Sequence, residues 1–269
     1  MKIWKYTISF LLIIYPFITF AQILQNLSAN QNIKVIELRN YLLKPGQREN
    51  FINLFEAKFI NPQQQVGSYT LGQYKVKGAE NNFFWIRGFK DMASRNKALN
   101  EFYYGITWKQ NRSEANSMIV NNDNVYLLKP LNIKGSTNKN EVRFNTNWFG
   151  KQKGIGVIDF YISNTKLDRL VEFVKKQYTA ILSNTGIEKT SFWVSETTPN
   201  DFAGLPVFQD KNLLVQITFY KDESEYQTKM KVVDSKMNDE QKSDMADLVT
   251  LKNTLIVYPT EKSFSLPGK

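Results

Sequence analysis

The chain has 269 residues, of which 42% are hydrophobic and 14% aromatic, and its 35 Lys and Arg against 25 Asp and Glu give a formal net charge of +10. It contains neither Cys nor His. This excludes disulfides, thiolate nucleophiles, Ser-His-Asp and Cys-His catalysis, ordinary zinc sites and a haem held by a proximal histidine, so we expect no metal and no cofactor.

The first 21 residues have the pattern of a secretory signal peptide. Lys2 and Lys5 form a positively charged segment before an apolar run from Tyr6 to Phe20, and Ala21 stands at a suitable cleavage position. The run is short for a membrane-spanning helix, which needs roughly 20 apolar residues, so an uncleaved anchor is the weaker alternative. We predict cleavage after Ala21, a periplasmic or secreted mature protein without a stable membrane span, and a flexible lead over residues 22–33.

The positive charge is spread along the chain. Removal of Lys2 and Lys5 leaves 33 basic residues (35 minus 2) against 25 acidic ones, a net charge of +8. No block of five like charges occurs, so solvated faces are the simplest interpretation. We predict no nucleic-acid partner, because contact with an anionic envelope surface is easier to motivate for an exported protein.

In chain order, the first half reads as six elements. The alternation of apolar side chains predicts a strand at 35–43, and helical spacing predicts a helix at 48–60 that Pro62 ends. Two strands follow at 68–76 and 83–89. A helical stretch over 92–119 is expected to split at Gly105, and a last strand covers 124–131.

The second half repeats this order about 120 residues later. It begins with a strand at Gly156, followed by a helix at 167–182, strands at 191–196 and 212–220, a helix from about Glu223 and a strand at 253–260. The third strand of each half ends in a similar tripeptide, Phe89-Lys90-Asp91 or Tyr220-Lys221-Asp222. A repeat of this length indicates a duplicated domain.

The βαββαβ order is that of a ferredoxin-like module. Two such modules in one chain can cover each other's open sheet face, so we predict an α+β protein whose tandem ferredoxin-like modules form an intramolecular dimeric α/β-barrel with a central cavity. The expected division is a first domain at 34–131, a linker at 132–153, a second domain at 154–262 and a tail at 263–269. The chain is expected to be a monomer or a homodimer.

Five sequence blocks carry a more specific resemblance: VIELRNYLLKPGQ, VGSYTLGQYKVKG, WIRGFKDMASRNKAL, FYYGITWKQNRSEAN and NVYLLKP. They follow one another almost without gaps, and over residues 34–130 the chain resembles the NIPSNAP family of dimeric α/β-barrel proteins. Fold relatives of that family include cofactor-independent monooxygenases, isomerases and haem-degrading proteins, so the scaffold alone implies no reaction. One position departs from the pattern of similar bacterial sequences. In the block that contains Trp108, those sequences usually have a His directly before the Arg, whereas this chain has Asn111 there.

Six residues form the candidate site: Glu37, Arg39, Tyr41, Trp85, Arg87 and Trp108. If Ile36, Leu38 and Leu42 face the helices, the polar residues of the first strand face the barrel interior. There Arg39 or Arg87 could bind the carboxylate of a planar acidic ligand, and Trp85 could stack on it. The alternative is that Glu37 neutralises the arginines in a buried ion network.

Other polar residues suggest packing. Arg95, Tyr103, Tyr104 and Arg112 lie at helical spacing, which is more typical of packing than of chemistry. The second half has less polar counterparts, with Asp159 and Tyr161 expected at the positions of Glu37 and Arg39, and with Gln216 and Thr218 at those of Trp85 and Arg87. The loop from Asp201 to Phe208 could form a gate, although a hairpin connection is the simpler interpretation.

These observations lead to three hypotheses about function. The first is a binding protein for a small acidic or aromatic ligand or for an envelope protein, in or near the barrel cavity. The second is a cofactor-independent enzyme, monooxygenase-like or isomerase-like, in which Glu37, Tyr41 and the arginines polarise the substrate. The third is a purely structural interaction module.

Overall fold

The computed structural model describes residues 33–131, 154–187, 190–261 and 263. The predicted signal peptide, nearly all of the predicted lead, the linker and most of the tail lie outside these residues. Among the residues described, no helix combines the length and apolar character needed to cross a membrane.

The first half contains the predicted elements with two additions. Its elements are β1 (Val35–Leu43), α2 (Arg48–Lys58), α3 (Ile60–Gln65), β2 (Tyr69–Val76), β3 (Ala79–Phe89), α4 (Met92–Tyr103), α5 (Ile106–Met118), β4 (Ile119–Asn121) and β5 (Val125–Pro130). The split at Gly105 is confirmed. The predicted stop at Pro62 is wrong: the helix breaks at Phe59, and Pro62 lies in the first turn of α3, where its missing N–H costs no hydrogen bond.

The second half repeats the pattern. Its elements are β6 (Ile155–Ser163), α6 (Leu167–Phe173), the π-helical turn η2 (Val174–Tyr178), α7 (Thr179–Asn184), β7 (Thr190–Ser195), β8 (Leu213–Tyr220), α8 (Glu223–Lys236), α9 (Asp239–Leu248) and β9 (Val249–Pro259). The repeated tripeptides end in helix caps. Asp91 accepts a hydrogen bond from the N–H of Ser94 at 2.7 Å, and Asp222 accepts one from the N–H of Glu225 at 2.8 Å.

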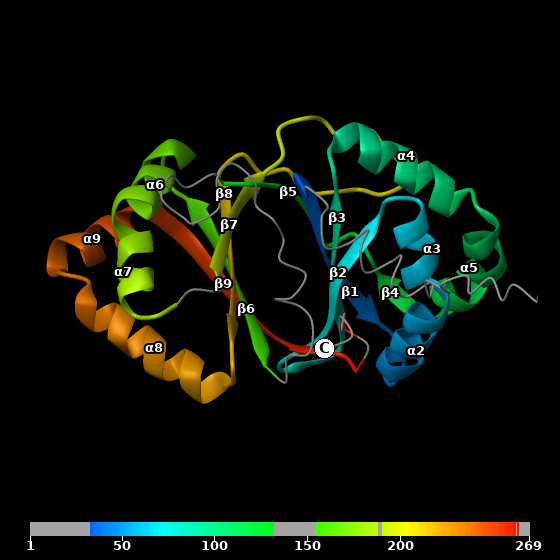
Figure 1. Ribbon diagram of the computed structural model, residues 1–269, viewed down its shortest axis with the longest axis horizontal. Coiled ribbons are helices and arrows are strands. Elements are labelled where there is room, and N and C mark those ends of the chain that lie inside the picture. Colours follow the sequence, from blue (N-terminus) through cyan, green and yellow to red (C-terminus); the bar gives the residue numbers. More distant parts are fainter. Residues whose placement is uncertain (1–32, 132–153, 188–189, 262, 264–269) are drawn as a thin grey trace, which may run out of the picture.

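The two halves together close a barrel of eight strands. The strand order is β3-β2-β9-β6-β8-β7-β5-β1, and the pairing of β1 with β3 completes the circle, while the short β4 adds to β1. The two seams between the halves are β2–β9 and β5–β7. Figure 1 shows α2 to α5 on one side of the strands and α6 to α9 on the other. The predicted fold of tandem ferredoxin-like modules is confirmed.

The barrel interior contains a cluster of buried apolar side chains from both halves. Its members include Ile36, Leu38, Phe84 and Ile86 of the first half together with Ile158, Phe160, Val215 and Ile217 of the second. Each sheet therefore buries two faces, one toward the other half and one toward its own helices.

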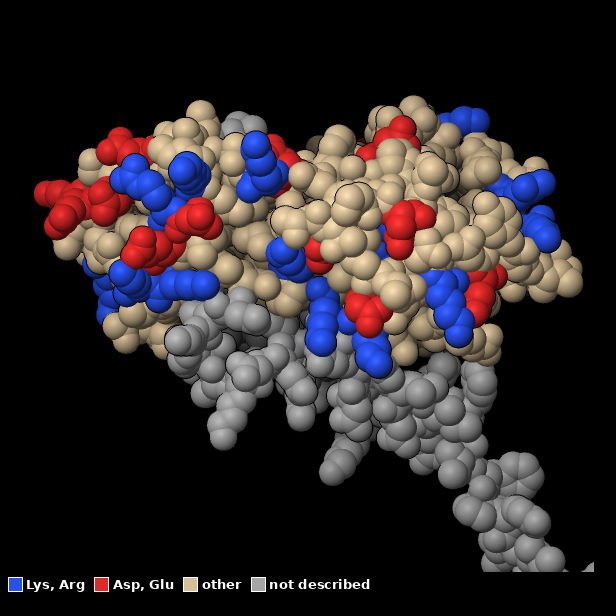
Figure 2. Space-filling model, turned by 90° about the horizontal axis from the view of Figure 1, so that it is seen from above, with Lys and Arg blue, Asp and Glu red and all other residues tan. Residues whose placement is uncertain are grey.

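The outer surface carries mixed charge. In Figure 2, Lys and Arg side chains alternate with Asp and Glu side chains over the visible face, and no large area of one sign stands out. This distribution agrees with the interpretation of the charged residues as solvated faces.

Candidate functional site

The polar face of β1 lies under the helices. Ile36 and Leu38 belong to the barrel interior, whereas Tyr41 packs with side chains of α2 and β3. Since successive side chains of a strand alternate between faces, Glu37 and Arg39 share the face of Tyr41. The predicted orientation is thus wrong: Ile36 and Leu38 point into the barrel, and Leu42 is 41% exposed. Alternation could not distinguish two faces that are both buried.

Glu37 is the centre of a buried ion network. Its Oε2 lies 2.6 Å from Nη1 of Arg39 and 2.7 Å from Nε of Arg87, and its Oε1 lies 2.7 Å from Nε of Arg95. The side chains of all four residues are at most 1% exposed. The first two contacts come from the sheet itself, because Glu37 faces Arg87 across the β1–β3 pair. The third comes from the first turn of α4.

The network fixes the protonation of its members. Burial alone would raise the pKa of Glu37, but Arg87, Arg39 and Arg95 together hold it well below its usual range. Burial raises the pKa of Tyr41, an effect that outweighs the opposing influence of Arg39. At neutral pH, Glu37 is therefore an anion and Tyr41 a neutral phenol.

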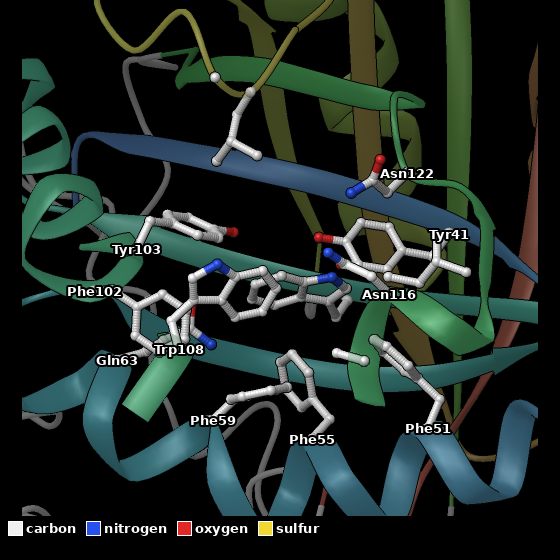
Figure 3. A pocket seen from close by; sticks show the side chains of 15 residues that line it. Tyr41, Phe51, Phe55, Phe59, Gln63, Phe102, Tyr103, Trp108, Asn116 and Asn122 are labelled. Carbon is white, nitrogen blue, oxygen red and sulfur yellow. The ribbon is translucent and has the colours of Figure 1, made fainter. Parts of the chain in front are cut away.

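A pocket of about 250 Å³ lies between this face of the sheet and helices α2 to α5. Its wall is mainly aromatic and includes Tyr41, Trp85, Phe102, Tyr103 and Trp108. Figure 3 shows Phe51, Phe55 and Phe59 entering from the side of α2, with the phenolic oxygens of Tyr41 and Tyr103 directed toward the centre from opposite sides. The ring of Trp108 packs on Tyr103 and Phe59, with centroids 5.0 and 5.5 Å apart.

Two hydrogen-bond donors of the pocket wall are available to a ligand. Trp85 is 2% exposed, and its Nε1–H has no partner among the residues described. The Nε–H of Arg39 donates to the Tyr41 hydroxyl oxygen at 3.0 Å, which leaves the hydroxyl hydrogen of Tyr41 free to donate. A buried donor without a partner costs free energy that a ligand oxygen would recover.

A loop of the second half, residues 196–212, completes the pocket. Gly204 and Leu205 form part of the wall. The loop is held in place by Asn200 and Asp201, whose Oδ1 atoms accept hydrogen bonds from Nη1 of Arg95 at 3.0 and 3.1 Å. The loop also buries Phe202 against the ring of Tyr103, with centroids 5.8 Å apart. The second half thus covers a site that belongs to the first.

The predicted site residues separate into two groups. Tyr41, Trp85 and Trp108 line the pocket, whereas Glu37, Arg39 and Arg87 form the ion network behind its wall. The ion-network interpretation of Glu37 is therefore confirmed. Neither Arg39 nor Arg87 is part of the pocket wall, and each donates to Glu37. Asn111 donates to the carbonyl of Thr107 at 2.7 Å and is not part of the pocket wall.

Three residues that complete the site were not predicted. Arg95 was interpreted as a packing residue, although an arginine within the apolar stripe of Ala98, Leu99 and Phe102 is a signal that could have identified it. Gln63 lines the pocket and accepts a hydrogen bond from Nη1 of Arg87 at 3.4 Å. Asp201 could not be identified from the local sequence, because it contacts Arg95, which lies 106 residues earlier in the chain.

Strand register shows how the second half differs. Thr218 lies two residues before the end of β8, as Arg87 does in β3, and this correspondence is as expected. The residue opposite Thr218 is Val157, so an apolar side chain occupies the position of Glu37. The second half therefore has no counterpart of the central carboxylate.

The expected correspondences on β6 were displaced by two residues. Because Ile155 pairs with Tyr220 as Val35 pairs with Phe89, Asp159 lies at the position of Arg39 and Tyr161 at that of Tyr41. The acidic residues Glu37 and Asp159 therefore do not correspond, because pairing with the neighbouring strand defines the alignment of the two halves.

Comparison with known proteins agrees with the division into halves. Residues 36–133 match the NIPSNAP family model. This match confirms the resemblance found in the sequence blocks of the first half, and we call residues 36–133 the NIPSNAP region. No curated protein matches the chain.

Solved structures match nearly the whole chain, and these matches establish the fold alone. A proposed monooxygenase from Fusobacterium nucleatum has 10% identity and a TM-score of 0.57, covering 87% of this chain and 98% of its own. A proposed monooxygenase from Lactobacillus acidophilus has 12% identity and a TM-score of 0.53, covering 86% and 98%. A heme-binding protein from Thermus thermophilus has 10% identity and a TM-score of 0.50, covering 85% and 92%.

Proposed function

We propose that the protein binds a small molecule in the pocket of the NIPSNAP region. The ligand has an aromatic or other apolar body and one oxygen that accepts hydrogen bonds. The observation that carries this proposal is the buried, unpartnered Nε1–H of Trp85 in the wall of an aromatic pocket. Ligand pockets typically combine such apolar walls with a few placed polar groups.

The pocket volume limits the size of the ligand. An apolar cavity of about 150 Å³ holds a benzene molecule. A volume of about 250 Å³ therefore accommodates a substituted ring or two fused rings. The aromatic side chains on opposite sides of the pocket favour a flat molecule, which they can contact by stacked or edge-to-face packing.

An acid-base enzyme has less support from the same residues. The pocket wall contains no carboxylate among the residues described. Glu37 is behind the wall, and its lowered pKa makes it a weak base with both oxygens engaged. The raised pKa of Tyr41 likewise favours a hydrogen-bond donor over a general base. We therefore favour binding over catalysis.

We propose that the protein acts outside the cytoplasm. The apolar run before Ala21 supports export to the periplasm or to the medium, and we propose that the protein binds its ligand there. Detection of the mature protein with Gln22 as its first residue in the culture medium or periplasmic fraction tests this; recovery of the uncleaved chain from cytoplasm would contradict it.

The test of the binding function uses 2-naphthoate as a probe in calorimetric titrations of the mature protein. Trp85→Phe keeps one aromatic ring but removes the Nε1–H and the pyrrole part of the indole, so the loss of a hydrogen bond together with packing area should weaken binding about tenfold or more. Tyr74→Phe is the matched control, because its hydroxyl is buried without a described partner and its ring packs in the barrel interior. Equal affinities of the wild type and Trp85→Phe would contradict the proposed site.

A further inference from the structure

The ion network behind the pocket has more positive than negative charge. It contains three buried guanidiniums, those of Arg39, Arg87 and Arg95, and one buried carboxylate, that of Glu37. Asp201 adds a second carboxylate, whose side chain is 38% exposed. Among the residues described, three positive charges thus face two negative ones. A buried charge without a counter-ion is unfavourable, so the network has a deficit of one negative charge.

The excess charge lies directly behind the pocket wall. The Cζ of Arg87 is 5.2 Å from the ring centroid of Trp85 and 5.9 Å from that of Tyr103. The Cζ of Arg39 is 5.4 Å from the ring of Tyr41. All three rings line the pocket. The Nη2 atoms of Arg87 and Arg95 are buried and have no hydrogen-bond partner among the residues described. Part of the positive charge of the network is therefore not neutralised by acceptors of the protein.

Charge at this distance acts strongly on the contents of the pocket. Coulomb interaction in a protein interior is several times stronger than in water, because fewer solvent dipoles oppose it. An anionic group that binds to Trp85 and Tyr41 would be separated from the guanidiniums of Arg39 and Arg87 only by aromatic rings of the pocket wall. A neutral group of the same shape would make the same hydrogen bonds without this gain.

We infer that the pocket selects a monoanion, namely an aromatic monocarboxylate, and that Asp201 sets the strength of this selection. One ligand carboxylate together with Glu37 and Asp201 balances the three guanidiniums. Asp201 is the adjustable member because it is partly exposed and comes from the loop of the second half. This inference rests on the proposed binding function and adds the charge of the ligand to it.

The test compares 2-naphthoate with 2-naphthamide, which has the same rings and an acceptor oxygen but no charge. Titration calorimetry near neutral pH should show that the carboxylate binds at least about tenfold more tightly. Asp201→Asn keeps an acceptor for Arg95 and removes one negative charge. It should strengthen 2-naphthoate binding about threefold or more and leave 2-naphthamide binding unchanged.

A further variant controls for net charge. Asp210→Asn makes the same charge change on the same loop, where Asp210 accepts a hydrogen bond from the N–H of Asn212 and, among the residues described, forms no ion pair with the arginines. It should leave both affinities unchanged.

The outcomes separate the two proposals. Equal affinity for the two probes, or no gain in Asp201→Asn, would overturn the inference about charge and leave the binding function standing. Binding of neither probe would overturn both.

Discussion

Glu37 and Arg87 face each other across the β1–β3 pair, and the Nε of Arg87 lies 2.7 Å from Oε2 of Glu37 on the face that the helices cover. The same carboxylate also forms ion pairs with Arg39 and Arg95. A single side chain therefore joins two strands and the helix α4. The first five predictions concern this network, the loop above it and the barrel interior.

Glu37→Gln should be strongly destabilising. It removes the negative charge from three buried guanidiniums, and loss of one partner from a buried ion pair costs about 3–5 kcal/mol. Urea unfolding monitored by circular dichroism measures the change. Glu101→Gln is the control, because Glu101 is exposed and forms an ion pair with the exposed Lys97; its effect should be below about 1 kcal/mol. A change below about 1 kcal/mol in Glu37→Gln as well would show that Glu37 does not hold the network together.

Arg87→Met should be less destabilising than Glu37→Gln. Removal of one guanidinium leaves two positive charges for the two carboxylates of Glu37 and Asp201, so it relieves the excess charge while losing one buried pair. The same unfolding measurement ranks the two variants. The reverse order would mean that the network has a counter-ion beyond the residues described, and the charge count would be wrong.

Stability should decrease as the pH falls through the carboxyl range. The folded-state pKa of Glu37 is held well below its unfolded value of about 4.3, so its contribution is complete above that value and is lost as the pH falls toward the folded pKa. Between about pH 4 and about pH 3, the wild type should lose up to about 1.4 kcal/mol more than Glu37→Gln. Parallel pH profiles of the two proteins would contradict the lowered pKa.

Phe202→Ala should destabilise the protein more than Phe208→Ala does. Phe202 is 9% exposed and packs on Tyr103, whereas Phe208 is 49% exposed. The expected losses are about 3 and about 1 kcal/mol, because the cost of truncation follows the buried area and the cavity that remains. Phe202→Ala should also weaken 2-naphthoate binding, since it loosens the loop that carries Leu205. Equal unfolding free energies of the two variants would indicate that the packing of Phe202 on Tyr103 does not stabilise the fold.

Tyr74→Phe should leave the free energy of unfolding unchanged or raise it by about 1–3 kcal/mol. The hydroxyl of Tyr74 is buried without a partner among the residues described, and its ring packs in the apolar interior. Removal of an unsatisfied buried hydroxyl abolishes its desolvation cost. Thermal unfolding measures the change, and a loss of more than about 1 kcal/mol would reveal a partner for this hydroxyl.

Much of the fold was predictable from the sequence. Periodicity located the elements of both halves because apolar side chains recur at helical or strand spacing along them, and the repeated order implied a closed barrel. The two buried faces of β1 could not be assigned, since Leu38 and Arg39 both lie at 0% exposure. Only the packing of the other half showed which of them points into the barrel.

The residues of the site that were predicted lie on the paired strands β1 and β3, with the exception of Trp108 on α5. Glu37 and Arg87 were grouped correctly because they lie on neighbouring strands of one module. The contact of Arg95 with Asp201 joins different halves and depends on the path of a loop, which local sequence does not encode. The second half therefore contributes to the site through its loop and not through a second copy of the arginine network.

The most direct test of the central claim is native mass spectrometry of the mature protein with 2-naphthoate. Ala115 is 1% exposed and lines the pocket, so Ala115→Leu should fill part of it, whereas Ala93→Leu places the same side chain on the exposed face of α4. We predict one bound 2-naphthoate per chain in the wild type and in Ala93→Leu, and none in Ala115→Leu. Equal occupancy in all three proteins would show that the ligand binds elsewhere and would contradict the account.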